Sequence, residues 1–152
     1  MPYFITELTG ITDQMLVSAP FIDEILPSLF EFLGNSNETV VVAHNSPFDL
    51  SFLKAASIAH EMPWPEYVTV DTARLARAVL DRDEVINCKL STLAQFFGAT
   101  TSPNHRALDD ALATVDVLHG LIERLAGFDI YNFEEMRSFP SKKRRVKRPI
   151  AE

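Results

Sequence analysis

Two short segments gather side chains that could do chemistry. The first, residues 43–53 (AHNSPFDLSFL), carries Asn45, Phe48 and Asp49 just beyond an apolar run. If that run is a strand, this is the place where α/β sheets bind ligands. The second, residues 104–111 (NHRALDDA), carries His105 and Asp110. Asp110 is expected on the flank of an apolar helix face, where a half-shielded acid can point into a cleft, and His105 could take a catalytic role from the preceding loop.

Plainer explanations exist for each of these residues. Asp49 could have no role beyond stabilising a helix N-terminus, where the helix dipole favours a carboxylate. A single loop histidine such as His105 needs no function, and Phe48 could pack in the core. Asp109 is expected to face solvent, and His119 to be structural or exposed.

The hydrophobic pattern predicts the elements that would position these residues. Residues 39–43 (TVVVA) form a β-branched run without alternation, which is typical of a parallel or central strand buried on both faces. A second short strand is predicted at 67–70, and Asp71-Thr72 is expected to cap the helix that follows. Helices are predicted at 20–33 (with a kink or break at Pro27), 48–60, 72–80, 90–97 and 106–126. Strands interleaved with helices indicate an α/β layer fold, and two strands alone make a thin sheet.

Composition and charge limit the class of protein. The 152 residues allow one domain, the single cysteine excludes an internal disulfide and a cysteine-based zinc cluster, and no apolar run approaches the roughly 18 residues of a membrane span. We therefore expect a soluble cytoplasmic protein without a membrane partner.

Residues 142–148 (KKRRVKR) hold six of the fourteen cations, so residues 1–140 carry eight cations against twenty acids, a net charge of −12. Such a body could bind nucleic acid if its acids converge on metal ions that bridge to phosphate.

Taken together, the two segments resemble a known family. HNxxFDxxFL, followed about sixty residues later by HxAxxDA, resembles the second and third motifs of the DEDD-type 3′–5′ exonucleases, in the branch that uses histidine, as in the proofreading epsilon subunit of bacterial DNA polymerase III. The resemblance extends over roughly residues 4–126. The flanking segments that share it are ITELTGIT (5–12), VDTARLAR (70–77), LSTLAQFFG (90–98) and HRALDDALATVDVLHGL (105–121).

The resemblance implies a helix-rich ribonuclease H-like fold and two divalent ions, Mg²⁺ or Mn²⁺, held by four carboxylates. Asp49 and Asp110 correspond to the second and fourth carboxylates, and His105 to the general base. Asn45 and Phe48 would lie beside the site and touch the nucleotide. Two such ions can stabilise the attacking and the leaving oxygen of an in-line displacement.

The family's first motif, Asp-x-Glu-Thr, has no match in this sequence. It would supply the other two carboxylates, so we expect an N-terminally truncated fold that lacks the first three antiparallel strands. The strand at 39–43 would then expose an unpaired edge and could self-associate. We expect an exonuclease-like domain over 1–126 and a linker or basic tail over 127–152.

These observations leave two functions open. One is a metal-dependent 3′–5′ exonuclease of proofreading or repair type that acts on single-stranded DNA 3′ ends, or on RNA. Its partner would be a polymerase or a repair protein. This chain would be inactive alone if the missing motif is essential. The other is a catalytically silent nucleic-acid-binding or assembly module derived from such an enzyme. Its basic run would bind phosphate backbones nonspecifically.

Overall fold

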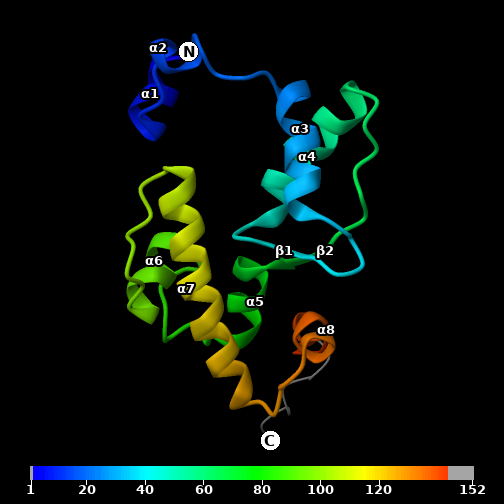
Figure 1. Cartoon of the computed structure of the whole chain (residues 1–152). Coiled ribbons are helices and arrows are strands. Elements are labelled where there is room, and N and C mark those ends of the chain that lie inside the picture. The colour runs from blue at the N-terminus through cyan, green and yellow to red at the C-terminus, as the bar shows by residue number, and fades with distance from the viewer. Residues whose placement is uncertain (1, 144–152) are drawn as a thin grey trace, which may run out of the picture.

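A computed structural model of the chain describes residues 2–143. It is a helix-rich α/β structure with one small parallel sheet (Figure 1). The elements are α1 (Tyr3–Thr9), α2 (Asp13–Leu16), α3 (Ile22–Leu33), β1 (Val40–Ala43), α4 (Ser46–Ala59), β2 (Val68–Asp71), α5 (Thr72–Val79), α6 (Leu90–Phe97), α7 (Ala107–Ala126) and α8 (Phe133–Lys143).

The sheet consists of β1 and β2, which run parallel as the sequence indicates. Their register pairs Val40 with Val68 and Ala43 with Asp71, so the carboxyl ends of both strands meet at one edge. The prediction that β1 is buried on both faces is wrong. Val40 and Val42, which share one face of β1, are 39% and 36% exposed, while the residues on the other face are half-buried. Within residues 2–143, no further strand pairs with the free edge of β1.

The hydrophobic core lies where α5, α6 and α7 meet. Figure 1 shows these helices side by side in the lower part of the molecule. The helix α5 begins where predicted because Asp71 accepts hydrogen bonds from the first N–H groups of the helix. The apolar stripe predicted for 106–126 is confirmed in α7, which contributes Val117, Leu121 and Leu125 to the core. This core fixes the direction of α7 and with it the first turn of that helix, which carries Asp110.

A helix forms where the sequence predicted a linker or tail after residue 126. The helix α8 lies beside α5 (Figure 1), and Met136 and Phe139 pack against the core. Only a few apolar residues mark this segment, so its periodicity is weak. The domain boundary stays a prediction, and residues 144–148 of the basic run lie outside the described residues.

Three further local results differ from or add to the sequence analysis. The helix α3 continues through Pro27 without a break, although proline removes one backbone donor. The short helices α1 and α2 form in a stretch without a clear period, and neither has a buried residue. None of the helices that the structure describes has the length and apolar character required to cross a membrane.

Candidate active site

The first candidate segment begins where the two strands end. Asp71, the last residue of β2, uses one carboxylate oxygen, Oδ1, to accept three backbone hydrogen bonds, from Ala73 N (2.9 Å), Arg74 N (3.2 Å) and Asn45 N (3.0 Å). Two of these cap α5 and the third holds the turn between β1 and α4. One carboxylate therefore ties the start of the first candidate segment to the start of α5.

His44 makes a second tie at the same junction. Its Nδ1 lies 2.9 Å from Thr72 Oγ1, and its Nε2 lies 3.1 Å from the carbonyl oxygen of Cys88. Burial lowers the pKa of His44 from the ordinary value of 6.5, against smaller opposing effects of the Cys88 carbonyl and the Asp71 carboxylate. The neutral imidazole is therefore the favoured form at neutral pH.

The turn after His44 presents the predicted nucleotide-binding and metal-binding residues to solvent. Asn45 adopts a left-handed backbone conformation (φ 67°), and α4 begins at the next residue. Asp49 lies exposed in the first turn of α4. Phe48 is 62% exposed and packs edge-on against Phe52, with ring centroids 5.1 Å apart. Within the described part of the chain, Phe48 is thus a surface residue, so core packing does not explain it.

The second candidate segment is organised around Asp110. Its Oδ1 accepts hydrogen bonds from the backbone N–H groups of Asn104 (3.0 Å) and His105 (3.2 Å), which orients the carboxylate toward the loop. Asp109 also bonds to this loop, through Asn104 Nδ2 at 2.7 Å, and is half-exposed rather than fully solvent-facing. His105 is exposed and has a left-handed backbone (φ 65°). The loop therefore places His105 and Asp110 side by side.

The structure brings together part of the predicted site. His105 and Asp110 are neighbours on the loop before α7, whereas Asp49 belongs to α4. Among residues 2–143, no three His, Cys, Asp or Glu side chains are grouped so that they could hold a metal ion. The residues present therefore do not form a complete metal centre, and the metal-binding roles of Asp49 and Asp110 stay predictions.

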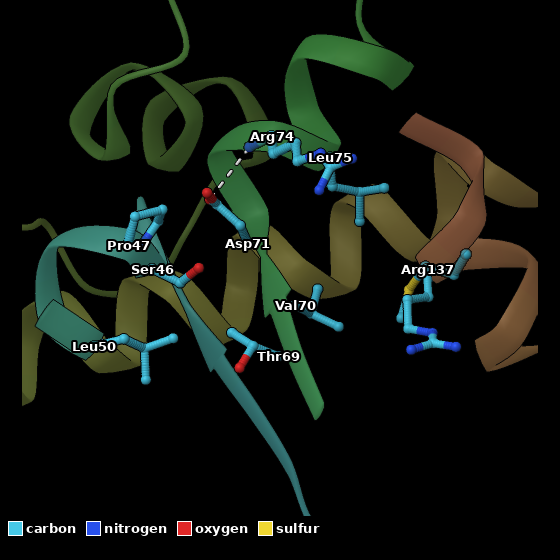
Figure 2. Close-up of a pocket in the computed structure, with 10 residues that line it drawn as sticks. Ser46, Pro47, Leu50, Thr69, Val70, Asp71, Arg74, Leu75 and Arg137 are labelled. Carbon is cyan, nitrogen blue, oxygen red and sulfur yellow. Dashed lines mark hydrogen bonds between the residues drawn. The ribbon is translucent and has the colours of Figure 1, made fainter. Parts of the chain in front are cut away.

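A groove of about 280 Å³ lies next to the strand ends. Its lining comes from the start of α4 (Ser46), from β2 and α5 (Asp71 and Arg74), and from α8 (Met136 and Arg137). Figure 2 shows Ser46, Asp71, Arg74 and Arg137 around the groove. Neither Asp49 nor the His105 loop lines it. The groove is thus beside the predicted site and separate from it.

Sequence reasoning assigned no role to His44 and gave Asp71 and Thr72 only the cap of the following helix. A signal was present, since His44 directly follows the first predicted strand and Asp71-Thr72 directly follow the second. In parallel neighbouring strands these positions meet at one edge. The contact with Cys88, which is 44 residues from His44, could not be foreseen from spacing.

Comparison with known proteins agrees with the motif pattern. A family model described as Exonuclease (RNase_T) matches residues 1–118. The "putative bifunctional exonuclease/endonuclease protein" of Mycobacterium tuberculosis is 47% identical over 155 aligned residues, which cover 100% of this chain and 24% of that protein. PolC-type DNA polymerase III is 42% identical over 118 residues in Clostridium perfringens (78% of this chain, 8% of the relative) and 38% identical over 135 residues in Caldanaerobacter subterraneus subsp. tengcongensis (89% and 9%). The chain thus spans a quarter or less of the length of these relatives.

Proposed function

Because the chain belongs to the exonuclease family, we propose that it serves as a 3′–5′ exonuclease of proofreading or repair type that hydrolyses DNA from its 3′ end and releases nucleoside monophosphates. The observation that carries this proposal is the ordered pair of motifs, AHNSPFD and HRALDDA, both inside the stretch that the family model matches. The names of the relatives, an exonuclease/endonuclease and PolC-type polymerases, support a nucleic-acid substrate and a polymerase or repair partner. We also propose a cytoplasmic location.

Specific roles follow for the residues of the two segments. We propose that Asp49 and Asp110 bind Mg²⁺ or Mn²⁺, as part of a two-ion site, and that His105 acts as the general base. His105 is exposed, so its imidazole is accessible to water and substrate. Among residues 2–143, the described carboxylates alone do not complete a metal centre.

The anchored carboxylate of Asp110 supports its proposed role. Two backbone donors hold Oδ1, which leaves Oδ2 for a ligand and restricts the rotation of the side chain. Asn45 and the exposed Phe48 lie on the turn and first helical turn next to Asp49, where an unpaired 3′ nucleotide would be bound. An aromatic side chain there can stack on any base, which suits a nuclease without sequence preference.

A second function is favoured by one observation, the lack of a complete ligand group among residues 2–143. In this alternative the chain binds nucleic acid or a partner protein without hydrolysing DNA, and the basic run at 142–148 supplies the contacts to phosphate. Such binding should weaken steeply with salt. The free edge of β1 is then a further place for self-association.

The test is release of mononucleotides from a 3′-labelled single-stranded DNA in the presence of Mg²⁺ or Mn²⁺. The exonuclease proposal predicts that chelation abolishes release. His105→Ala should reduce release at least about 10²-fold, the usual range for loss of a general acid or base. Asp49→Asn and Asp110→Asn, which each remove a proposed metal ligand, should also reduce it strongly. Asp109→Asn is the matched control for Asp110→Asn, because both residues bond to the same loop. Circular dichroism of every variant verifies that the fold is intact.

The same variants separate the two functions. Release of nucleotides that survives all three substitutions would refute the proposed active site. The binding module would be favoured if the wild-type chain releases no nucleotides but binds DNA in a salt-sensitive way. That binding should survive Asp49→Asn and Asp110→Asn and be lost on deletion of 141–148.

A further inference from the structure

The imidazole of His44 joins three parts of the fold at one point. It directly follows β1, its Nδ1 contacts the hydroxyl of Thr72 at the start of α5, and its Nε2 contacts the carbonyl of Cys88 ahead of α6. Thr72 is fully buried. The segment that leads to Asp49 is therefore attached at its first residue to the helix that packs on α7.

The partners determine where the proton of this imidazole lies. A carbonyl oxygen only accepts, so Nε2 carries the hydrogen and donates it to Cys88. In the neutral ring Nδ1 then accepts from the hydroxyl of Thr72. If the ring were protonated, Nδ1 would become a donor, and the Thr72 hydroxyl would have to turn to the carbonyl of Ala43, which lies farther away at 3.4 Å.

Few other contacts hold the start of α4. Asn45 accepts no helix N–H with its side chain, and its backbone is in the left-handed region, which costs a non-glycine residue free energy unless its surroundings hold it. Among the described residues, the hydrogen bonds that tie residues 44 and 45 to other elements are the bond from Asn45 N to Asp71 and the two bonds of His44, while the bond from Phe48 N to Asn45 O (3.0 Å) lies within the turn itself. Loss of the His44 bonds should loosen this turn and the first turn of α4.

We propose that His44 is a positioning residue, whose bonds to Thr72 and Cys88 hold the Asn45–Asp49 turn in the orientation that the exonuclease reaction requires. This inference rests on the proposed function. His44 itself contacts neither substrate nor metal in this role. The charged groups that act on the ring are Asp71, Arg77 and Asp49. The residue whose carbonyl contacts Nε2, Cys88, also carries a titratable thiol.

The test measures backbone amide hydrogen exchange in the full chain together with nuclease kinetics. The variant His44→Phe keeps a ring and removes both bonds, and Thr72→Val removes the hydroxyl and keeps the shape. His119→Gln, on the exposed side of α7, is the matched control. We expect exchange at the amides of residues 45, 46, 48 and 49 to rise about tenfold per hydrogen bond lost, with exchange in α6 and α7 unchanged.

Kinetics then distinguish positioning from general stabilisation. We expect kcat to fall about tenfold with KM nearly unchanged in His44→Phe, and His44→Gln, whose amide can still donate to Cys88, to recover part of the loss. Unchanged exchange over residues 45–49 in both His44→Phe and Thr72→Val would overturn the inference, as would acceleration spread evenly over the chain. An inactive wild-type chain would contradict the proposed function, and the exchange measurement would still decide whether His44 holds the turn.

Discussion

Replacing Asp71 with alanine should destabilise the chain more than removal of an ordinary helix cap. One oxygen of this half-buried carboxylate accepts hydrogen bonds from two N–H groups of α5 and from Asn45 N. Loss of an N-cap acceptor typically costs about 1 kcal/mol. The third bond, to a charged acceptor, adds roughly 1–2 kcal/mol. We therefore expect the free energy of unfolding to fall by about 2–3 kcal/mol in Asp71→Ala.

Urea denaturation followed by far-UV circular dichroism measures this loss. Asp71→Asn is the conservative control, because asparagine keeps the oxygen and caps helices about as well as aspartate, so its loss should stay below about 1 kcal/mol. Thr12→Ala is the matched cap control. It removes the N-cap acceptor of α2, whose bond to Met15 N is 3.4 Å long and whose helix buries no residue. We expect it to cost under about 0.5 kcal/mol.

The comparison between Asp71→Ala and Thr12→Ala shows whether the Asp71 carboxylate does more than cap a helix. If Asp71→Ala loses no more stability than Thr12→Ala, the Asp71 carboxylate does not tie β1, α4 and α5 together. A loss equal in Asp71→Ala and Asp71→Asn would show that the charge, and not the three-bond geometry, is responsible.

Three further predictions concern the packing and titration of the fold. Gly120→Ala would place a methyl carbon 2.3 Å from Phe97 Cδ1, and overpacking of about 1–3 kcal/mol exceeds the helix-propensity gain of about 1 kcal/mol. Urea unfolding should show a net loss that Phe97→Leu in the same chain partly reverses. Because burial lowers the folded-state pKa of His44 below 6.5, its contribution to stability is present above that pH and falls as the pH drops through the folded-state pKa. Urea midpoints measured between about pH 5 and pH 8 should show this slope, and His44→Asn should flatten it. The backbone N–H and the hydroxyl of Thr100 lower the pKa of Asp116 from 3.8, so its contribution is present above about that pH and lost below the lowered value. Carboxyl NMR titration should show the Asp116 pKa rising in Thr100→Val, without reaching 3.8, because the larger backbone contribution remains.

The sequence predicts the elements that bury a regular face. The stripe on α7 identifies the helix within one residue of its observed start, and both strands appear within one residue of their predicted ranges. The motif pair leads to the exonuclease family, which the comparisons confirm. These features are visible because burial of a face imposes a period on apolar residues.

Other features depend on contacts that no local pattern records. The helix α8 packs through Met136 and Phe139, too few apolar residues to produce a stripe. The run at 39–43 indicates a strand buried on both faces, yet β1 has one described partner strand and one of its faces is exposed. The composition of a strand does not record which elements cover it, so its burial cannot be predicted from the run alone. Similarly, the motifs predict that Asp49 and Asp110 belong to one site, but their separation depends on how two different helices are packed.

The packing of the fold identifies the element that controls this separation. Asp49 lies on α4, which packs on β1 and β2 and is tied at its start to Asp71 and Thr72. Asp110 lies on α7, which packs on α5 and α6. The helix α5 is thus shared by both halves, since its first residues hold the turn before α4 and its buried face contacts α7. A change at the start of α5 should therefore alter the position of Asp49 relative to Asp110 without altering either side chain, whereas a change at the α6–α7 contact should lower stability and leave the turn before α4 in place.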